Sequence, residues 1–138
     1  GTIMLEDSLK YVIICIDDDP LILKLLSFQL NKVIEHETTI VECFLEPMEV
    51  VENIDSLISH DLEVLLLLVD YQMPSINGAE LIRNIKQKYP ELKCIMLSGQ
   101  ANNIIVNELR SDHLIEKFIS KPWEEGNLLS EVSKIMGK

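Results

Sequence analysis

The stretch YVIICIDDDPLILKLL, residues 11–26, carries three consecutive aspartates between an apolar run and a helix-like run. The apolar run is typical of a parallel strand that is buried on both faces. Asp19 and Pro20 suit a helix start, because Asp is a favoured N-cap and Pro is common at the first helical position. Capping leaves Asp17 and Asp18 unexplained. At an effective dielectric of ~20, charges ~4 Å apart repel by about 4 kcal/mol, so we expect a cation there; a solvated acidic loop is the alternative.

Strand-like and helix-like patterns alternate from this stretch to the end of the chain. Five strands alternating with five helices predict an α/β fold, with a parallel sheet covered by helices on both faces. Ligands of such sheets bind beyond the carboxyl ends of the strands. The first helical stripe of apolar residues comprises Ile22, Leu25, Leu26 and Leu30. The predicted strands are residues 11–16, 38–43, 64–69, 93–97 and 117–120.

The composition of the chain limits the class of protein to which it can belong. With 138 residues, 47% of them hydrophobic and 25% charged, it is typical of one globular domain. We expect this domain over residues 11–138, with residues 1–10 as an N-terminal leader or an expression remnant. A formal charge of -11 argues against direct nucleic acid binding, because such binders concentrate Lys and Arg on one face. The longest apolar runs are far shorter than the ~20 residues of a transmembrane helix, so we expect no membrane segment and a cytoplasmic location.

The chain has three cysteines, Cys15, Cys43 and Cys94, which lack the CxxC spacing of metal and redox motifs. Two of them lie inside apolar, strand-like runs. We therefore expect reduced packing residues rather than metal ligands or disulfide bridges.

Chemically active residue types also follow the third, fourth and fifth predicted strands. Asp70 comes after VLLLLV and should emerge at the sheet edge that carries the first acidic cluster; taken alone, it could instead cap its loop. Three carboxylates at one edge resemble a site for Mg²⁺, which binds one or two carboxylates with waters and phosphate oxygens. Strand four ends with the hydroxyl of Ser98, and strand five with the ammonium of Lys121. A hydroxyl donor and a positive charge beside carboxylates are suited to hold a phosphoryl group.

The motifs IDDDP, LLLLVDYQMPSINGAEL, IMLSGQAN and FISKPW, in this order and approximate spacing, resemble the receiver domain of two-component response regulators. Each motif is weak by itself, and the resemblance comes from the ordered set, which covers residues 11–136. It implies a flavodoxin-like (CheY-like) doubly wound sheet of five parallel strands in the order 2-1-3-4-5, with five helices. It further implies a phosphoprotein of signal transduction, of the kind that works in two-component systems and phosphorelays.

Carried over by position, Asp70 would accept a phosphoryl group from a histidine kinase or a phosphotransfer protein. Asp18 would ligate Mg²⁺ directly and Asp17 mostly through water, while Asp70 and the main-chain carbonyl of Gln72 would complete the protein ligands. Lys121 would pair with the Asp70 carboxylate and then with the phosphoryl oxygens. Because a carboxylate and a phosphoryl group are both anionic, their repulsion must be neutralised, and Mg²⁺ and Lys121 would supply the positive charge.

The resemblance also implies a conformational switch. Ser98 would donate its hydroxyl to the phosphoryl group, and Phe118 matches the family's switch aromatic, which turns inward with that movement. An ordinary core aromatic is the alternative for Phe118. The switch would control an output domain or a downstream effector protein. The resemblance is also compatible with a homodimer. Apart from its own phosphorylation and dephosphorylation, the domain would catalyse nothing, so it is not expected to be an enzyme.

Smaller signals accompany these motifs. Lys121-Pro122 resembles the family's cis peptide, although most bonds before proline are trans. Asn77-Gly78 is typical of turn chemistry at a helix start, without a catalytic duty. The side chains of Gln72 and Gln100 lie where family members tune the lifetime of the acyl phosphate.

Two other classes of protein compete with this interpretation. A phosphatase of the haloacid dehalogenase type would use Asp17 as nucleophile and Asp19 as acid and base, but it leaves Asp70 without a role. A pseudo-receiver would be an interaction module that has lost phosphorylation, although every key position is filled here. Phosphorylation by acetyl phosphate separates the second class from an active receiver, and turnover of a generic phosphate ester would favour the first.

Overall fold

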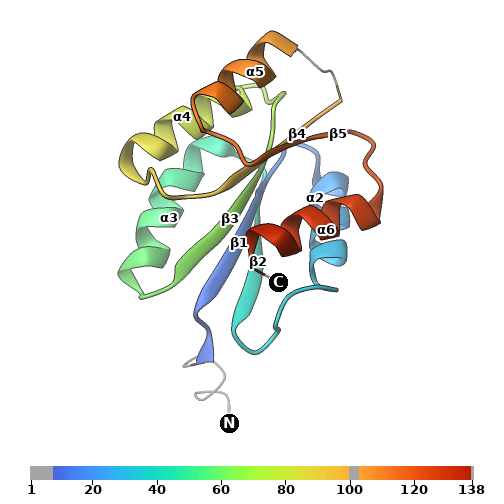
Figure 1. Ribbon diagram of the computed structural model, residues 1–138. Coiled ribbons are helices and arrows are strands. Elements are labelled where there is room, and N and C mark those ends of the chain that lie inside the picture. Colours follow the sequence, from blue (N-terminus) through green and yellow to red (C-terminus); the bar gives the residue numbers. More distant parts are fainter. Residues whose placement is uncertain (1–7, 100–102, 138) are drawn as a thin grey trace.

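The apolar runs of the sequence form the strands of one parallel sheet. The computed structural model describes residues 8–99 and 103–137 (Figure 1). The strands are β1 (Tyr11–Ile16), β2 (Thr39–Phe44), β3 (Glu63–Asp70), β4 (Cys94–Ser98) and β5 (Lys117–Ser120). The α-helices are α2 (Pro20–Leu30), α3 (Val50–Ser59), α4 (Gly78–Lys88), α5 (Asn103–Ser111) and α6 (Glu125–Ile135), and a 3-10 turn, η1 (Pro47–Glu49), precedes α3.

The order of the strands places β1 and β3 side by side near the middle of the sheet. The order is β2-β1-β3-β4-β5, and each neighbouring pair is parallel. Helices α2 and α6 cover one face, and α3, α4 and α5 cover the other (Figure 1). This confirms the flavodoxin-like, doubly wound fold. The switch in strand order lies between β1 and β3, where ligands bind in folds of this type.

The sheet separates two hydrophobic cores. Because β1 and the run 64–69 of β3 are apolar, side chains on both faces of these strands are buried, and alternate residues point into different cores. Ile14 and Leu67 face α3, α4 and α5, whereas Cys15 and Leu68 face α2 and α6. Both cores include side chains with no exposed surface, and the sheet that they hold determines where each strand ends.

The observed elements differ from the sequence prediction in a few places. Strand β2 begins and ends one residue later than predicted, and β3 extends by one residue at each end to include Asp70. In α2, Leu25 was expected in the buried stripe, but its side chain is 43% exposed, while Leu23 is only 5% exposed. The helix packs through Leu23, Leu26 and Leu30, so a residue between the first two turns toward solvent.

Local signals at two helix starts act as predicted. The Asp19 carboxylate accepts a hydrogen bond of 2.9 Å from the Leu21 N–H, and Pro20 is the first residue of α2. The Asn77 side chain accepts one of 2.9 Å from the Glu80 N–H at the start of α4. Each cap satisfies a backbone donor that the helix itself cannot pair.

The prediction of packing cysteines holds for two of the three. Cys15 and Cys94 are buried, one in each core, and all three thiols are free. For Cys43 the prediction is wrong: this residue is exposed, because β2 is an edge strand.

Some predictions concern residues that the structure does not describe. Most of the predicted leader at residues 1–10 falls in this category, as does Gln100. Over residues 8–99 and 103–137, the helices are too short or too polar to cross a membrane.

Candidate functional site

Three carboxylates meet where β1 and β3 end. Asp17 and Asp18 follow the last residue of β1, and Asp70 is the last residue of β3, which pairs with β1. One carboxylate oxygen from each of the three lies within 4.8 Å of the others. Asp17 and Asp70 are buried, with 1% and 4% of their surface exposed, whereas Asp18 faces solvent. The sequence-predicted acidic cluster is therefore present in the fold.

The ammonium of Lys121 joins this cluster from the loop after β5. Its Nζ donates to Asp17 Oδ2 at 2.7 Å and to Asp70 Oδ1 at 2.9 Å. The Lys121 side chain is 19% exposed, so the two ion pairs are largely shielded from water. The Lys121-Pro122 peptide bond is cis, as in the family that the sequence resembles. One lysine thus bridges the ends of two neighbouring strands.

The electrostatics of the cluster are unbalanced toward negative charge. Burial raises the pKa of Asp17 and of Asp70, even though the hydrogen bonds from Lys121 act to lower both. Burial acts to lower the pKa of Lys121, but its hydrogen bonds to the two carboxylates outweigh burial, and the pKa is raised. One ammonium pairs with two of the three carboxylates, so a second cation would stabilise their charged forms.

Main-chain contacts orient the Asp17 carboxylate and hold the backbone next to both buried aspartates. The Asp19 N–H donates to Asp17 Oδ1 at 2.9 Å, so the residue that caps α2 also orients Asp17. The Asp17 N–H donates to the carbonyl of Phe44 on β2 at 3.2 Å. After Asp70, the Tyr71 N–H donates to the carbonyl of Leu97 at 2.9 Å, which ties the end of β3 to β4.

Gly78 supports Asp70 in a way that the sequence analysis missed. Its N–H donates to the carbonyl of Tyr71 at 2.8 Å, which brings the start of α4 against the end of β3. A Cβ at position 78 would overlap the carbonyl oxygen of Asp70 and lie 3.0 Å from the Tyr71 Cα. Glycine was expected here for turn chemistry alone. The close approach to the Asp70 backbone is a tertiary requirement that local sequence patterns do not reveal.

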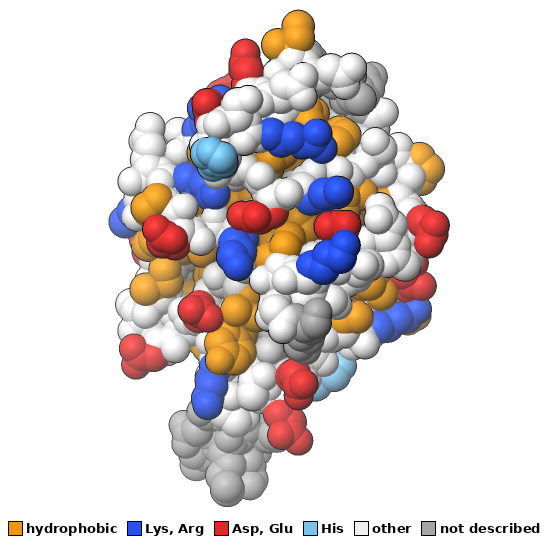
Figure 2. Space-filling model, viewed as in Figure 1, with side chains coloured by type: hydrophobic (Ala, Val, Ile, Leu, Met, Phe, Trp, Pro, Cys, Tyr) orange, Lys and Arg blue, Asp and Glu red, His pale blue; other side chains and the backbone are white. Residues whose placement is uncertain are grey.

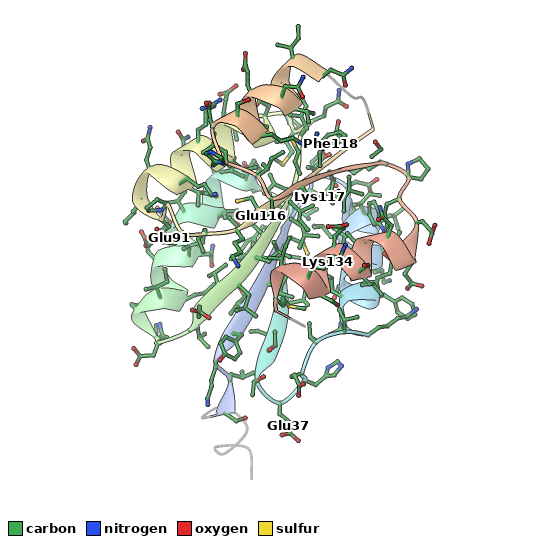
Figure 3. The ribbon with its side chains drawn as sticks, viewed as in Figure 1. Glu37, Glu91, Glu116, Lys117, Phe118 and Lys134 are labelled. Carbon is green, nitrogen blue, oxygen red and sulfur yellow. The ribbon has the colours of Figure 1, made fainter. Side chains whose placement is uncertain are left out.

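The other predicted site residues occupy the same edge of the sheet or lie close to it. Ser98 ends β4 and is 2% exposed, and its carbonyl accepts a hydrogen bond of 2.8 Å from the Lys121 N–H. Phe118 on β5 is partly buried and packs against the core beneath α3, α4 and α5 (Figure 3). Gln72 is exposed in the loop two residues after Asp70.

This arrangement suits an oxygen-ligand metal and a phosphoryl group. The donor set is composed of carboxylate oxygens, which hard divalent cations prefer over nitrogen and sulfur. Burial raises the pKa of Asp17 and of Asp70 in spite of their hydrogen bonds from Lys121, so a second cation would favour their charged forms. The residues therefore fit a divalent cation, and a cation beside Lys121 would make the edge a place for an anionic group.

A doubly wound sheet with an acidic cluster and a lysine at its switch point defines a class of α/β signalling domain. The response regulator receiver domain family matches residues 13–133, and the chain belongs to this family. The match covers the segment from β1 to α6, including the acidic cluster and Lys121.

Individual relatives agree with this assignment. The chain is 27% identical over 93 residues to the sensor kinase CckA of Brucella abortus, which covers 67% of this chain and 9% of CckA. It is 28% identical over 69 residues to the hydrogenase transcriptional regulatory protein HoxA of Cupriavidus necator, which covers 50% of this chain and 14% of HoxA. The chain thus spans a small part of these curated relatives.

Solved structures show the same fold. A CheX–CheY–BeF3–Mg²⁺ complex from Borrelia burgdorferi superposes with a TM-score of 0.79 at 18% sequence identity, covering 96% of this chain and 94% of the other. The likeness extends over the whole sheet and its helices, so the chain shares the fold of that structure.

Proposed function

We propose that Asp70 accepts a phosphoryl group from a phosphohistidine in a Mg²⁺-dependent reaction, and that the phosphorylated domain controls an output. The observation that carries the proposal is the bridge from Lys121 to Asp17 and Asp70, at 2.7 and 2.9 Å, inside a cluster of three carboxylates. The carboxylates would hold a cation, and Lys121 orients the acceptor and offers a positive charge to the incoming group.

In the transfer, an Asp70 carboxylate oxygen attacks phosphorus in line with the bond to the donor histidine. A P–O bond forms, the P–N bond breaks, and the imidazole leaves with the electron pair. Lys121, which holds Asp70 Oδ1 in the resting domain, moves its hydrogen bond to a phosphoryl oxygen. Asp17, Asp18, Asp70 and the carbonyl of Gln72 would hold Mg²⁺, which would supply positive charge against the repulsion between the two anionic groups.

After transfer, the acyl phosphate presents new acceptor oxygens at the end of β3. Ser98, at the end of the neighbouring strand β4, donates its hydroxyl to one of them. Phe118 lies on the next strand and is partly buried against the core, and in the proposed switch it turns further inward. The coupled movement of Ser98 and Phe118 is the proposed switch, and it acts on an output domain or an effector protein.

A histidine kinase or a phosphotransfer protein is the proposed donor, and its docking surface adjoins the site. Leu21, Leu25 and Phe28 expose 73%, 43% and 65% of their surface along α2, whose first turn follows the acidic cluster. A cavity of about 240 Å³ next to them is lined by Leu25, Lys121 and Trp123, among others. An apolar helix face of the donor would cover these residues and place its histidine over Asp70.

Other features of the proposal follow from charge and from the family. On the face viewed in Figure 2, Lys and Arg side chains alternate with Asp and Glu. Lys117 and Lys134, for example, lie 3.9 and 3.5 Å from Glu131. Such mixing of charges favours binding to partner proteins rather than to nucleic acid.

We place the domain at residues 11–138, preceded by a leader or remnant, and in the cytoplasm. There it catalyses only its own phosphorylation and dephosphorylation.

The phosphatase alternative fits the geometry less well. It needs Asp19 to act as acid and base beside an Asp17 nucleophile, but the Asp19 carboxylate accepts a hydrogen bond from the Leu21 N–H as the cap of α2. Asp70, which it leaves unused, lies in the cluster and pairs with Lys121.

Intact-protein mass spectrometry tests the proposal. The domain is incubated with acetyl phosphate and MgCl₂, and with EDTA in place of MgCl₂. We expect a gain of one phosphoryl group with Mg²⁺, little gain with EDTA, and no gain in Asp70→Asn. Glu52→Gln, which removes an exposed acid on α3, should behave like the wild type. A wild-type domain that stays unmodified would favour the pseudo-receiver.

A further inference from the structure

Two cysteines lie opposite each other on neighbouring strands. Cys15 on β1 and Cys43 on β2 are direct partners in the parallel register. Partners in a parallel pair point to the same face of the sheet, and here that face carries α2. Cys94 belongs to β4 and faces the opposite core, so it cannot take part in the same contact.

The spacing of these two residues suits a covalent bond between their sulfurs. Neighbouring strands lie about 4.8 Å apart, and disulfides join residues whose Cα atoms are about 4.4–6.8 Å apart. The two thiols also shift each other's pKa, upward for Cys15 and downward for Cys43. A disulfide therefore needs rotation of the side chains and no rearrangement of the sheet.

The environments of the two thiols differ. Cys43 is exposed on the edge strand, whereas Cys15 is buried with no exposed surface. The Cys43 thiol also donates to the main-chain carbonyl of Leu23 at 3.8 Å. Its interaction with Cys15 lowers the pKa of Cys43, so more of the reactive thiolate is present. An exposed thiol with a second cysteine beside it is the arrangement of a redox-sensitive pair.

We propose that Cys43 is a site of oxidation by hydroperoxides and that Cys15 then joins it in an intrachain disulfide. The Cys43 sulfur attacks one peroxide oxygen, so an S–O bond forms, the O–O bond breaks, and water or an alcohol leaves. Cys15 attacks the resulting sulfenic acid; the S–S bond forms, the S–O bond breaks, and the hydroxyl leaves as water with the Cys15 proton. The hydroperoxide gains two electrons and the two thiols lose them.

The disulfide would form next to the proposed phosphorylation site. Cys15 lies two residues before Asp17, and the residue after Cys43 is Phe44, whose carbonyl accepts the hydrogen bond from the Asp17 N–H at 3.2 Å. The oxidised pair would tie β1 to β2 where both strands lead into the acidic cluster. Because Cys43 is exposed, thiol reductants can reach the bond and reverse it.

The test is oxidation of the full chain with hydrogen peroxide, followed by denaturing, non-reducing mass spectrometry and peptide mapping. We expect the monomer to lose the mass of two hydrogen atoms, with the peptides of Cys15 and Cys43 cross-linked, and dithiothreitol to restore the original mass. Cys43→Ser should abolish the loss. Cys94→Ser, a matched change of a buried cysteine, should keep it, because burial raises the pKa of Cys94 to about 12.

A second variant establishes the order of events. In Cys15→Ser, which leaves Cys43 without its partner, dimedone should trap a sulfenic acid at Cys43. Asp70→Asn should oxidise like the wild type, so the outcome does not depend on phosphorylation. The proposal is overturned if wild-type Cys15 remains open to alkylation after peroxide treatment and unfolding. It is equally overturned if the cross-link joins two chains or involves Cys94.

Discussion

At the scale of single residues, Asp70 is held in a state that favours a further cation. Burial raises its pKa, and neighbouring Asp17 and Asp18 act in the same direction, while Lys121 opposes them. Burial raises the pKa of Asp17 in the same way. Ionising either group therefore costs more in the folded state than in the unfolded chain, and a divalent cation would reduce that cost.

The first prediction concerns pH and Mg²⁺. A carboxyl whose folded pKa is raised contributes stability that is present below its unfolded pKa of about 4 and lost as pH rises through the folded pKa. Asp17 and Asp70 thus weaken the metal-free domain at pH 7 and not at pH 4. At tenfold excess over its dissociation constant, Mg²⁺ should add about 1.4 kcal/mol at pH 7 and little at pH 4.

Thermal unfolding with MgCl₂ or EDTA at the two pH values measures this effect. The expected rise in Tm at pH 7 is about 3–5 °C for a domain of this size. Asp70→Asn should shrink the rise, and Glu52→Gln should not. An equal rise at both pH values would show that Mg²⁺ acts away from the acidic cluster.

The second prediction concerns Gly78. Alanine at this position would push its Cβ into the Asp70 carbonyl, so the end of β3 or the start of α4 must move. Overpacking of this kind costs about 1–3 kcal/mol, and a displacement of ~1 Å at a reacting group slows a reaction on the order of 10²-fold. We expect Gly78→Ala to lose stability in urea and to accept phosphoryl groups from acetyl phosphate more slowly.

Gly126→Ala is the matched control. Gly126 lies in α6, and a Cβ there would meet only the end of the Glu124 side chain, at 3.0 Å. This variant should be as stable as the wild type or slightly more so, with an unchanged rate. A Gly78→Ala domain with wild-type stability and rate would remove the positioning role of this glycine.

At the scale of elements, α2 has two apolar faces with different duties. One face, with Leu23, Leu26 and Leu30, packs into the core. The other exposes Leu21 in the first turn, next to the site, and Phe28 in the last turn of the helix. Exposed apolar side chains along one helix face are typical of a surface that another protein covers.

The third prediction tests that second face. Phe28→Ala should slow transfer from a phosphorylated histidine phosphotransfer protein on the order of 10-fold, because it removes apolar contact area at the proposed interface. Acetyl phosphate needs no docking surface, so its rate should not change. Ile58→Ala on α3 removes another exposed apolar side chain and should affect neither rate. Equal slowing with both donors would place the effect of Phe28 in the site itself.

The sequence predicts the elements well where apolar patterns are continuous, and less well where a helix is apolar all round. Strand β1 was predicted with its observed bounds, because its apolar run ends at the aspartates. The prediction of the core face of α2 is partly wrong, because Leu25 fits a helical stripe as well as Leu23 does. Only tertiary packing decides between two such stripes.

The same limit applies to the site. Asp17, Asp18, Asp70 and Lys121 could be predicted because strand ends of a parallel sheet converge at one edge. Gly78 could not, because its constraint is a backbone contact between β3 and α4. The pairing of Cys15 with Cys43 depends on the register of β1 and β2, which the sequence leaves open by a residue or more.

At the scale of the whole molecule, two cores hold the sheet whose edge forms the site. The core beneath α3, α4 and α5 contains Ile54 with no exposed surface, and Ile58 on the same helix is 39% exposed. The fourth prediction uses this pair. Ile54→Ala should lower the free energy of unfolding by about 2–5 kcal/mol, because it leaves a cavity, whereas Ile58→Ala should cost less than about 1 kcal/mol.

Urea unfolding followed by circular dichroism measures both variants. Similar losses would mean that α3 does not pack as described. Below the unfolding transition, Ile54→Ala should still gain a phosphoryl group, since the acidic cluster belongs to the ends of β1 and β3.

The most direct test of the central claim locates the phosphoryl group on the chain. Sodium borohydride reduces an aspartyl phosphate to homoserine, and peptide mapping by mass spectrometry finds the altered residue. After treatment with acetyl phosphate and Mg²⁺, homoserine should appear in place of Asp70 and nowhere else. Homoserine in place of Asp17, Asp18 or Asp19, or its absence from every peptide, would contradict the assignment of Asp70 as the phosphoacceptor.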